Sequence, residues 1–381
     1  MRDIVRIIMA VTGGALALVG LGLAALWAVA PFLWRTNPVA TNVLIAAGAA
    51  LGLLYGLLLF VQAFRGEDAP APWPPVWILL LLWAGVLTIG TISLAGVEGD
   101  TFAAWVFPPL HVLAVALPVV ALLAIGAQRS RAPAGRLAVQ FAYGGTLAFL
   151  LSLGVEVGLL LALGAVAAAL TGPTTGLTTF VQSLISGNLG AVGDLRAAPA
   201  LLALVVVARV LLVPLVEEAA KALTIPWWAG WEPSQARALA WGLAAGLGFA
   251  LTEGLLMMRP ALEAGAWWPS LLGLAGTALV QGMCTALVGV LWWRGRTRRR
   301  PLNLAVGYLL AVALHAFWNM GGIARALVAN LPPGPTATQD PAYDVVFADI
   351  IGVGGAALLL VLLAALLFRL TARSRWLEEG T

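Results

Sequence analysis

Long apolar stretches dominate this sequence, and they restrict the fold more than any other feature. A helix needs about 20 mostly apolar residues to cross the hydrocarbon core of a bilayer. The stretches that reach this length are 7–30, 39–64, 75–96, 104–127, 137–163, 201–226, 237–258, 269–293, 302–323 and 349–369. Runs of this length do not follow the alternating pattern of a membrane barrel. The sequence therefore predicts an all-α fold, a polytopic transmembrane helical bundle of about ten spans.

The arginines divide unequally between the two sides of this bundle. With a cytoplasmic N-terminus, the inner links and helix ends hold Arg2, Arg6, Arg65, Arg129, Arg131, Arg136, Arg237, Arg294, Arg296, Arg298, Arg299, Arg300, Arg369, Arg373 and Arg375. The outer links hold only Arg35, Arg196, Arg259 and Arg325. Cytoplasmic segments carry an excess of basic residues. We therefore expect an integral protein of a bacterial-type cytoplasmic membrane, with both termini in the cytoplasm.

This distribution also accounts for the basic pI of about 9.8. A basic soluble protein would suggest a nucleic-acid partner, but arginines at the ends of membrane helices are typical of topology signals. We expect the lipid bilayer as a partner and no nucleic acid.

The sixth predicted span contains an unusual group of ionisable residues. Glu217, Glu218 and Lys221, the only lysine of the chain, lie within an otherwise apolar run. A charged side chain at the centre of a bilayer costs about 2.5–3.5 kcal/mol on insertion scales, and such residues commonly mark functional sites. This group is therefore the first candidate for a site.

Three later spans carry polar residues at a comparable depth. At a rise of about 1.5 Å per residue, Glu217 lies roughly 15 Å from the cytoplasmic end of its span, and Glu253, Gln281 and His315 lie roughly 16–21 Å from the ends of theirs. Polar groups in lipid turn inward, towards one another or towards water. We therefore expect the four helices to converge on one polar pocket.

Helical spacing supports the same pocket. The pairs Glu217 with Lys221, Gln281 with Thr285, and His315 with Asn319 are each four residues apart, and so is Phe249 from Glu253. Residues at this spacing share one face of a helix.

Three interpretations of the pocket remain open from the residues alone. In a non-catalytic scaffold, Glu217–Lys221 and Glu253–His315 would be structural ion pairs. A transporter would also place ionisable residues at this depth, although we find no internal repeat of the kind that transporters show. We favour an enzyme, because converging groups with opposed protonation demands suit acid–base chemistry. Glu156, a carboxylate alone in the fifth span, either forms a hydrogen bond across helices, which we favour, or belongs to the site.

The motifs on these four helices resemble those of the PrsW family of intramembrane proteases, a family related to the CAAX prenyl-protein endopeptidases and bacteriocin-processing enzymes. The matching residues are Glu217-Glu218-x-x-Lys221, Phe249-x-x-x-Glu253, His315-Ala316-Phe317-Trp318-Asn319 and the segment from Gln281 to Gly289. The resemblance covers about residues 200–325. It implies an intramembrane endopeptidase, glutamic or metal-dependent, that cleaves a membrane-anchored protein substrate, with the first motif's glutamate activating water.

Residue roles follow from this implied reaction. Glu217 would be the base, Glu218 would orient water or pair with a neighbouring helix, and Glu253 would hold or shuttle the proton. His315 and Asn319 would donate hydrogen bonds to the oxyanion, as amide hydrolysis requires. The supporting residues would be Lys221, Phe249, Gln281 and Thr285.

The chain departs from the family pattern at Gln281, where the motif usually begins with His. A neutral amide is a poor ligand for zinc, which prefers imidazole, thiolate or carboxylate. If a divalent metal such as zinc is present, the remaining ligands would be Glu217, Glu253 and His315. We predict that metal is weakly bound or absent.

The expected organisation of the chain follows from the spans and motifs together. Residues 1–170 would form a scaffold of about five spans, and 171–200 an outer loop with a short helix on the membrane surface. Residues 201–370 would form the PrsW-like catalytic core, and 371–381 a cytoplasmic tail.

Overall fold

The computed structural model of the chain describes residues 2–33, 38–65, 73–95, 101–171, 199–228, 234–257 and 267–329, and the single positions 362, 365 and 369. The described residues form helices joined by short links, with no strand among them. The predicted tenth span, apart from positions 362, 365 and 369, and the tail at 371–381 lie outside these residues, as does the predicted surface helix within 171–200. The all-α fold class is confirmed.

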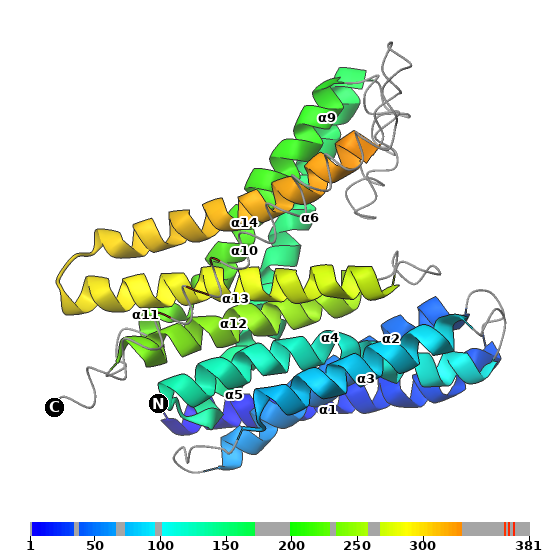
Figure 1. Cartoon of the computed structure of the whole chain (residues 1–381). Coiled ribbons are helices and arrows are strands. Elements are labelled where there is room, and N and C mark those ends of the chain that lie inside the picture. The colour runs from blue at the N-terminus through cyan, green and yellow to red at the C-terminus, as the bar shows by residue number, and fades with distance from the viewer. Residues whose placement is uncertain are drawn as a thin grey trace.

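Helices of the first half occupy one side of the molecule (Figure 1). They are α1 (Arg2–Leu33), α2 (Pro38–Phe64), α3 (Val76–Ala95) and α4 (Thr101–Ser130). Small residues let α1 and α2 pack closely, because a side chain added at Gly20 would reach within 2.5 Å of the Leu53 backbone nitrogen. Small residues at helix contacts are a common packing device in membranes.

The fifth and sixth predicted spans each contain a π-helical segment. The fifth consists of α5 (Ala134–Tyr143), η1 (Gly144–Ala148) and α6 (Phe149–Thr171). The sixth consists of α9 (Pro199–Val206), η3 (Val207–Leu212) and α10 (Val213–Ala222), and the short α11 (Ile225–Trp228) follows it. Single π-turns inside helices often occur at functional sites.

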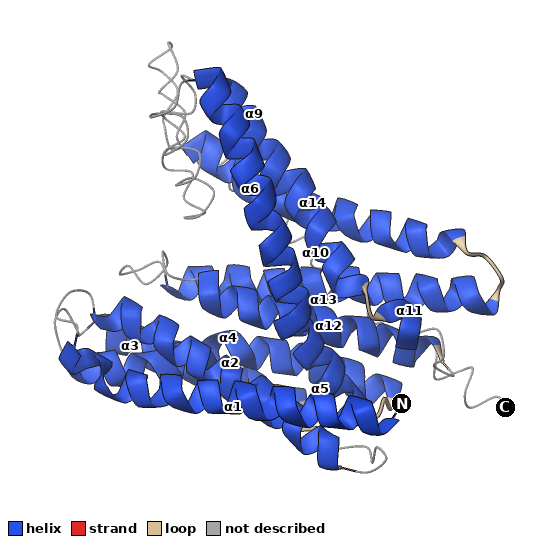
Figure 2. Ribbon diagram, turned by 180° about the vertical axis from the view of Figure 1, so that it is seen from behind, coloured by secondary structure: helices blue, strands red, loops and turns tan. Residues whose placement is uncertain are grey.

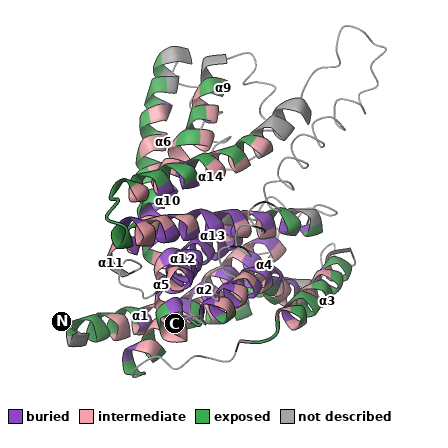
Figure 3. Ribbon diagram, turned by 60° about the vertical axis from the view of Figure 1, so that its left-hand side comes forward, coloured by how far each residue is buried: buried purple, intermediate pink, exposed green. Residues whose placement is uncertain are grey.

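The last three described helices complete the bundle. Helix α12 (Gln235–Met257) and helix α13 (Trp267–Thr297) run along the first-half helices, and α14 (Leu302–Ala329) diverges from them towards α6 and α9 (Figures 1 and 2). Every residue from Ala238 to Thr252 is buried, so α12 lies at the centre of the core. Figure 3 shows the same distribution, with burial concentrated in the central helices and exposure on α1, α3 and α6.

Eight helices among the described residues are long and apolar enough to cross a membrane. Their exposed large side chains, such as Leu18 on α1, Leu81 on α3 and Leu161 on α6, are those of a surface that contacts lipid. The helix formed by α9, η3 and α10, which carries Arg209, Glu217, Glu218 and Lys221, is not one of the eight. The protein is an integral membrane protein.

Candidate active site

The helix that carries the first motif is distorted for a reason that lies in its sequence. In η3 the backbone N–H of Val213 donates to the carbonyl of Ala208, five residues back. The next N–H in this pattern would belong to residue 214, but proline has none. The carbonyl of Arg209 therefore lacks a helical donor, and the Asn319 side chain of α14 supplies one at 3.0 Å. This bond joins the two helices that carry Glu217 and His315.

In the structure, one amide N–H group of Asn319 thus donates to the Arg209 backbone. The local reason is the missing N–H of Pro214, which leaves a partly buried acceptor to be satisfied. The expected role of Asn319 as an oxyanion donor stays a prediction.

Tyrosine side chains hold the same helix at two further carbonyls. The Tyr308 hydroxyl donates to the Leu215 carbonyl at 2.8 Å, and the Tyr143 hydroxyl donates to the Ala220 carbonyl at 2.7 Å. Both contacts lie within three residues of a motif carboxylate or of Lys221. Sequence reasoning missed these residues. Their rarity and position could have identified them, because the chain has only four tyrosines beside 16 tryptophans and these two lie inside predicted spans.

Glu218 is the most fully engaged carboxylate of the site. Its Oε1 accepts from Lys221 Nζ at 2.6 Å and lies 2.9 Å from His315 Nδ1. The hydroxyl of Thr285 lies 3.5 Å from its Oε2. All three contacts are buried. Glu218 therefore pairs with α13 and α14, and His315 pairs with Glu218 rather than with Glu253, contrary to the structural network considered above.

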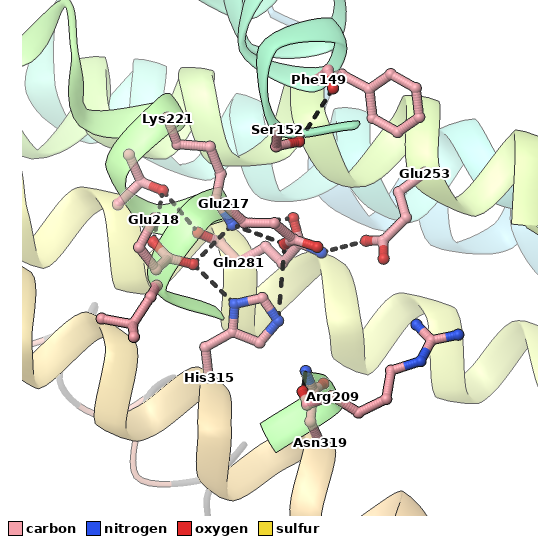
Figure 4. A network of polar contacts seen from close by, with 12 residues as sticks. Phe149, Ser152, Arg209, Glu217, Glu218, Lys221, Glu253, Gln281, His315 and Asn319 are labelled. Atoms are coloured by element: carbon pink, nitrogen blue, oxygen red, sulfur yellow. Dashed lines mark hydrogen bonds and ion pairs between the residues drawn. The ribbon is translucent and has the colours of Figure 1, made fainter. Parts of the chain in front are cut away.

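Glu217 is held more loosely than its neighbour. Its Oε2 lies 3.5 Å from Lys221 Nζ and 3.8 Å from His315 Nε2, and the residue is 4% exposed. The two nitrogens of His315 therefore face different carboxylates (Figure 4). An ionised Glu218 only accepts hydrogen bonds and therefore favours the proton on Nδ1, while Nε2 remains directed at Glu217.

The amide of Gln281 connects the two ends of the cluster. Its Oε1 accepts from Lys221 Nζ at 3.3 Å, and its Nε2 donates to Glu253 Oε2. Lys221 Nζ also lies 4.6 Å from the centre of the Phe249 ring, a cation–π contact. The helices α10, α12, α13 and α14 thus meet in one buried polar cluster, as their common depth predicted.

Two acidic residues lie on the remaining side of the cluster. Glu253 is half-buried and interacts electrostatically with Glu217. Glu156 of α6 interacts electrostatically with Glu253, Arg209 and Lys221. Glu156 therefore lies near enough to the site to interact with its charges, and the expected hydrogen bond across helices stays a prediction.

The expected metal ligands do not form a ready three-ligand set. Glu217 and His315 face each other, but Glu253 is engaged by the Gln281 amide. No group of three or more His, Cys, Asp and Glu side chains within the described ranges is arranged to hold a metal ion. The ammonium of Lys221 is a cation that contacts the Glu217 and Glu218 carboxylates.

Chemically, the arrangement combines a loosely held carboxylate, a histidine oriented by a second carboxylate, and a fixed positive charge. Such a set can accept a proton from water and return one to a leaving group.

Comparison with known proteins assigns the chain to a family. The family described as PrsW family intramembrane metalloprotease matches residues 132–347, more than half of the chain. The matched segment begins just before α5 and includes every residue of the polar cluster. No curated protein and no solved structure matches the chain. The chain therefore belongs to the PrsW family of intramembrane metalloproteases, and it is an intramembrane protease.

Proposed function

We propose that this protease hydrolyses a peptide bond of a membrane-anchored protein with a water molecule activated by Glu217. The observation that carries the proposal is the unequal engagement of the two adjacent carboxylates. Glu218 has partners at 2.6 and 2.9 Å, whereas the closest contacts of Glu217 Oε2 are 3.5 and 3.8 Å. A base must keep an oxygen available for the proton that it removes. Glu217 meets this requirement better than Glu218.

The proposed water molecule bridges Glu217 and His315. A water oxygen can lie about 2.8 Å from both Glu217 Oε2 and His315 Nε2, off the line that joins them. In the proposed reaction Glu217 takes a proton from this water, and the hydroxide attacks the carbonyl carbon of the peptide bond. The carbonyl oxygen becomes an oxyanion. Glu217 then returns the proton to the amide nitrogen as the C–N bond breaks, which leaves a carboxylic acid and an amine.

His315 is the proposed principal donor to the oxyanion. Glu218 fixes the orientation of the ring through Nδ1–H. When the ring is doubly protonated, its Nε2–H donates a hydrogen bond to the oxyanion from the side of Glu217. The second N–H of the Asn319 amide and the Gln281 amide are proposed as auxiliary donors. Donors placed at a developing oxyanion commonly account for a hundred- to a thousandfold in turnover.

Glu253 is the proposed partner of Glu217 in holding the proton. The two carboxylates interact electrostatically in one largely apolar pocket, and such carboxylates titrate as a coupled pair. Gln281, on α13, forms hydrogen bonds with Glu253 of α12 and with Lys221 of α10. Its amide therefore keeps the acidic and basic groups of the site at fixed positions. Phe249 covers Lys221 on the same side.

The family description makes a bound metal plausible, and the residues of this chain bear on that point. Zinc sites in enzymes use three protein ligands and keep one position open. Here Glu253 is bonded to Gln281, and Lys221 lies among the carboxylates, so the side chains as arranged do not fit a zinc ion. We propose that metal is bound weakly or not at all, and no step above depends on it.

The substrate is expected in the bilayer beside the enzyme, because the cluster is buried among helices that contact lipid. We also retain the proposed orientation with both termini in the cytoplasm, which rests on the distribution of arginines.

The proposal is tested by mapping newly formed protein N-termini in membranes of cells that express the wild-type enzyme or Glu217→Gln. Glu67→Gln, in a link between two expected spans, is the matched control. We expect a set of new N-termini that the wild type and the control share and that Glu217→Gln lacks at equal abundance. Cleavage by Glu217→Gln at the wild-type rate would contradict the role of Glu217.

A further inference from the structure

A tyrosine of the first-half helices contacts the helix that carries Glu253. Tyr55 belongs to α2 and precedes the family-matched segment, which starts at residue 132. Its side chain is 1% exposed. Its hydroxyl lies 2.9 Å from the Gly248 carbonyl and 3.0 Å from Thr252 Oγ1, both on α12. One side chain of the N-terminal half thus reaches two successive turns of a motif helix.

A second hydrogen bond extends this contact to a third helix. The Thr252 hydroxyl donates to the Gly145 carbonyl at 2.8 Å, and Gly145 lies in the π-helical segment η1. The Tyr55 hydroxyl can then donate to the Gly248 carbonyl or to Thr252 Oγ1. We call Tyr55, Thr252, Gly145 and Gly248 the tyrosine node. It joins α2, η1 and α12.

Glycine makes the close approach of these helices possible. A side chain at Gly145 would collide with the Tyr55 ring, and one at Gly248 would come within 3.0 Å of the Gly145 nitrogen. The ring of Tyr55 also packs 5.7 Å from that of Phe141, on α5. The node therefore allows little sliding or rotation of α12.

The same two turns of α12 face the active site with an adjacent face. Phe249 and Glu253 directly follow Gly248 and Thr252 in the sequence, and successive residues of an α-helix are about 100° apart. Phe249 contacts Lys221, and Glu253 accepts from Gln281. Any axial shift or rotation of α12 at the node would therefore displace Glu253.

We propose that Tyr55 is a positioning residue of the protease, which sets the height and rotation of Glu253 through Thr252 and Gly248. This inference rests on the proposed part of Glu253 in the reaction. It also gives the N-terminal half a function that the motifs do not assign: its α2 aligns α12 with the other three motif helices.

The test compares Tyr55→Phe with Trp83→Phe in the full-length enzyme. The first removes only the hydroxyl of the node. The second removes the hydrogen bond from Trp83 Nε1 to the Ala114 carbonyl, which joins α3 to α4 at 2.8 Å. A displacement of about 1 Å at a catalytic group can lower turnover a hundredfold. We expect Tyr55→Phe to lower kcat about ten- to a hundredfold with KM and Tm close to wild type, and Trp83→Phe to leave kcat unchanged.

A second readout does not require proteolysis. Dicyclohexylcarbodiimide modifies protonated carboxyl groups in apolar surroundings, and mass spectrometry reports the modification of Glu253 separately from that of Glu217. We expect Tyr55→Phe to increase the modification rate of Glu253 severalfold, because Glu253 moves away from the Gln281 amide. Thr252→Val should have the same effect, and Tyr55→Phe should add little to it.

The two readouts separate the two proposals. If the wild type shows no proteolysis while Tyr55→Phe still changes the labelling of Glu253, the proposed function fails and the positioning role stands. If Tyr55→Phe leaves the labelling of Glu253 unchanged, the positioning role is wrong. The inference would also be wrong if Trp83→Phe lowered kcat as much as Tyr55→Phe does. It would be wrong as well if the fall of kcat in Tyr55→Phe were accompanied by a loss of Tm, because Tyr55 would then have a structural role only.

Discussion

Replacing each of the two adjacent glutamates by glutamine should produce two different defects. Glu218 contacts Lys221 at 2.6 Å and His315 at 2.9 Å, with Glu218 and Lys221 fully buried. Glu218→Gln keeps the shape of the side chain but removes the charge that the ammonium faces. Removing one partner of a buried ion pair costs about 3–5 kcal/mol, and we expect a loss of unfolding free energy in this range.

Glu217→Gln should be milder in stability and more severe in activity. The Glu217 carboxylate lies 3.5 Å from Lys221, which keeps Glu218 as its closer partner. The loss should then resemble that of one hydrogen bond, about 0.5–1.5 kcal/mol. Cleavage should be abolished, because the amide cannot take a proton from water.

Reversible unfolding in mixed detergent micelles, titrated with dodecyl sulfate and followed by tryptophan fluorescence, measures both variants. The double variant Glu218→Gln with Lys221→Met is the control, since removing both charges leaves none stranded and should restore part of the stability. Equal losses in the two single variants, or a larger loss in Glu217→Gln, would refute the assignment of the structural and catalytic carboxylates.

Two further predictions concern metal and topology. Elemental analysis of the purified wild type should find zinc well below one ion per chain. The variant Gln281→His should raise the zinc content, and the double variant Gln281→His with His315→Ala should lower it again. One zinc ion per wild-type chain that is lost in Glu253→Gln would contradict the predicted weak binding. Single cysteines introduced at Ser234 and Thr338 should react with an impermeant maleimide from opposite sides of the membrane. The native Cys284 is buried and should not react. Labelling of both introduced cysteines from one side would exclude the proposed topology.

The sequence alone predicted the helices and the convergence of the motifs well. Apolar length fixed the positions of the spans to within a few residues over the described ranges, because a helix in lipid has to satisfy its own backbone. The common depth of Glu217, Glu253, Gln281 and His315 predicted their meeting. The depth of a residue in the membrane depends only on its position along its own helix. It can therefore be predicted from the sequence without knowing how the helices pack.

The pairing of side chains within the site could not be predicted in the same way. Whether His315 faces Glu217, Glu218 or Glu253 depends on how two helices are rotated relative to each other. The spacing of residues along each helix gives no information on that rotation. The π-helical turn before Pro214 adds a further shift in phase between Arg209 and Glu217. For this reason the use of the Asn319 amide at the Arg209 carbonyl, and the tyrosine contacts on α10, were found only in the structure.

The ionisable residues of the helix formed by α9, η3 and α10 have a consequence for the synthesis of the protein. Glu217, Glu218 and Lys221 each cost about 2.5–3.5 kcal/mol at the bilayer centre, and the local pair of Lys221 with Glu218 offsets only part of this cost. Their other partners, Gln281 and His315, leave the ribosome later. We therefore expect this segment to gain stability in lipid when α13 and α14 pack beside it, so that its stable insertion and the assembly of the active site are coupled.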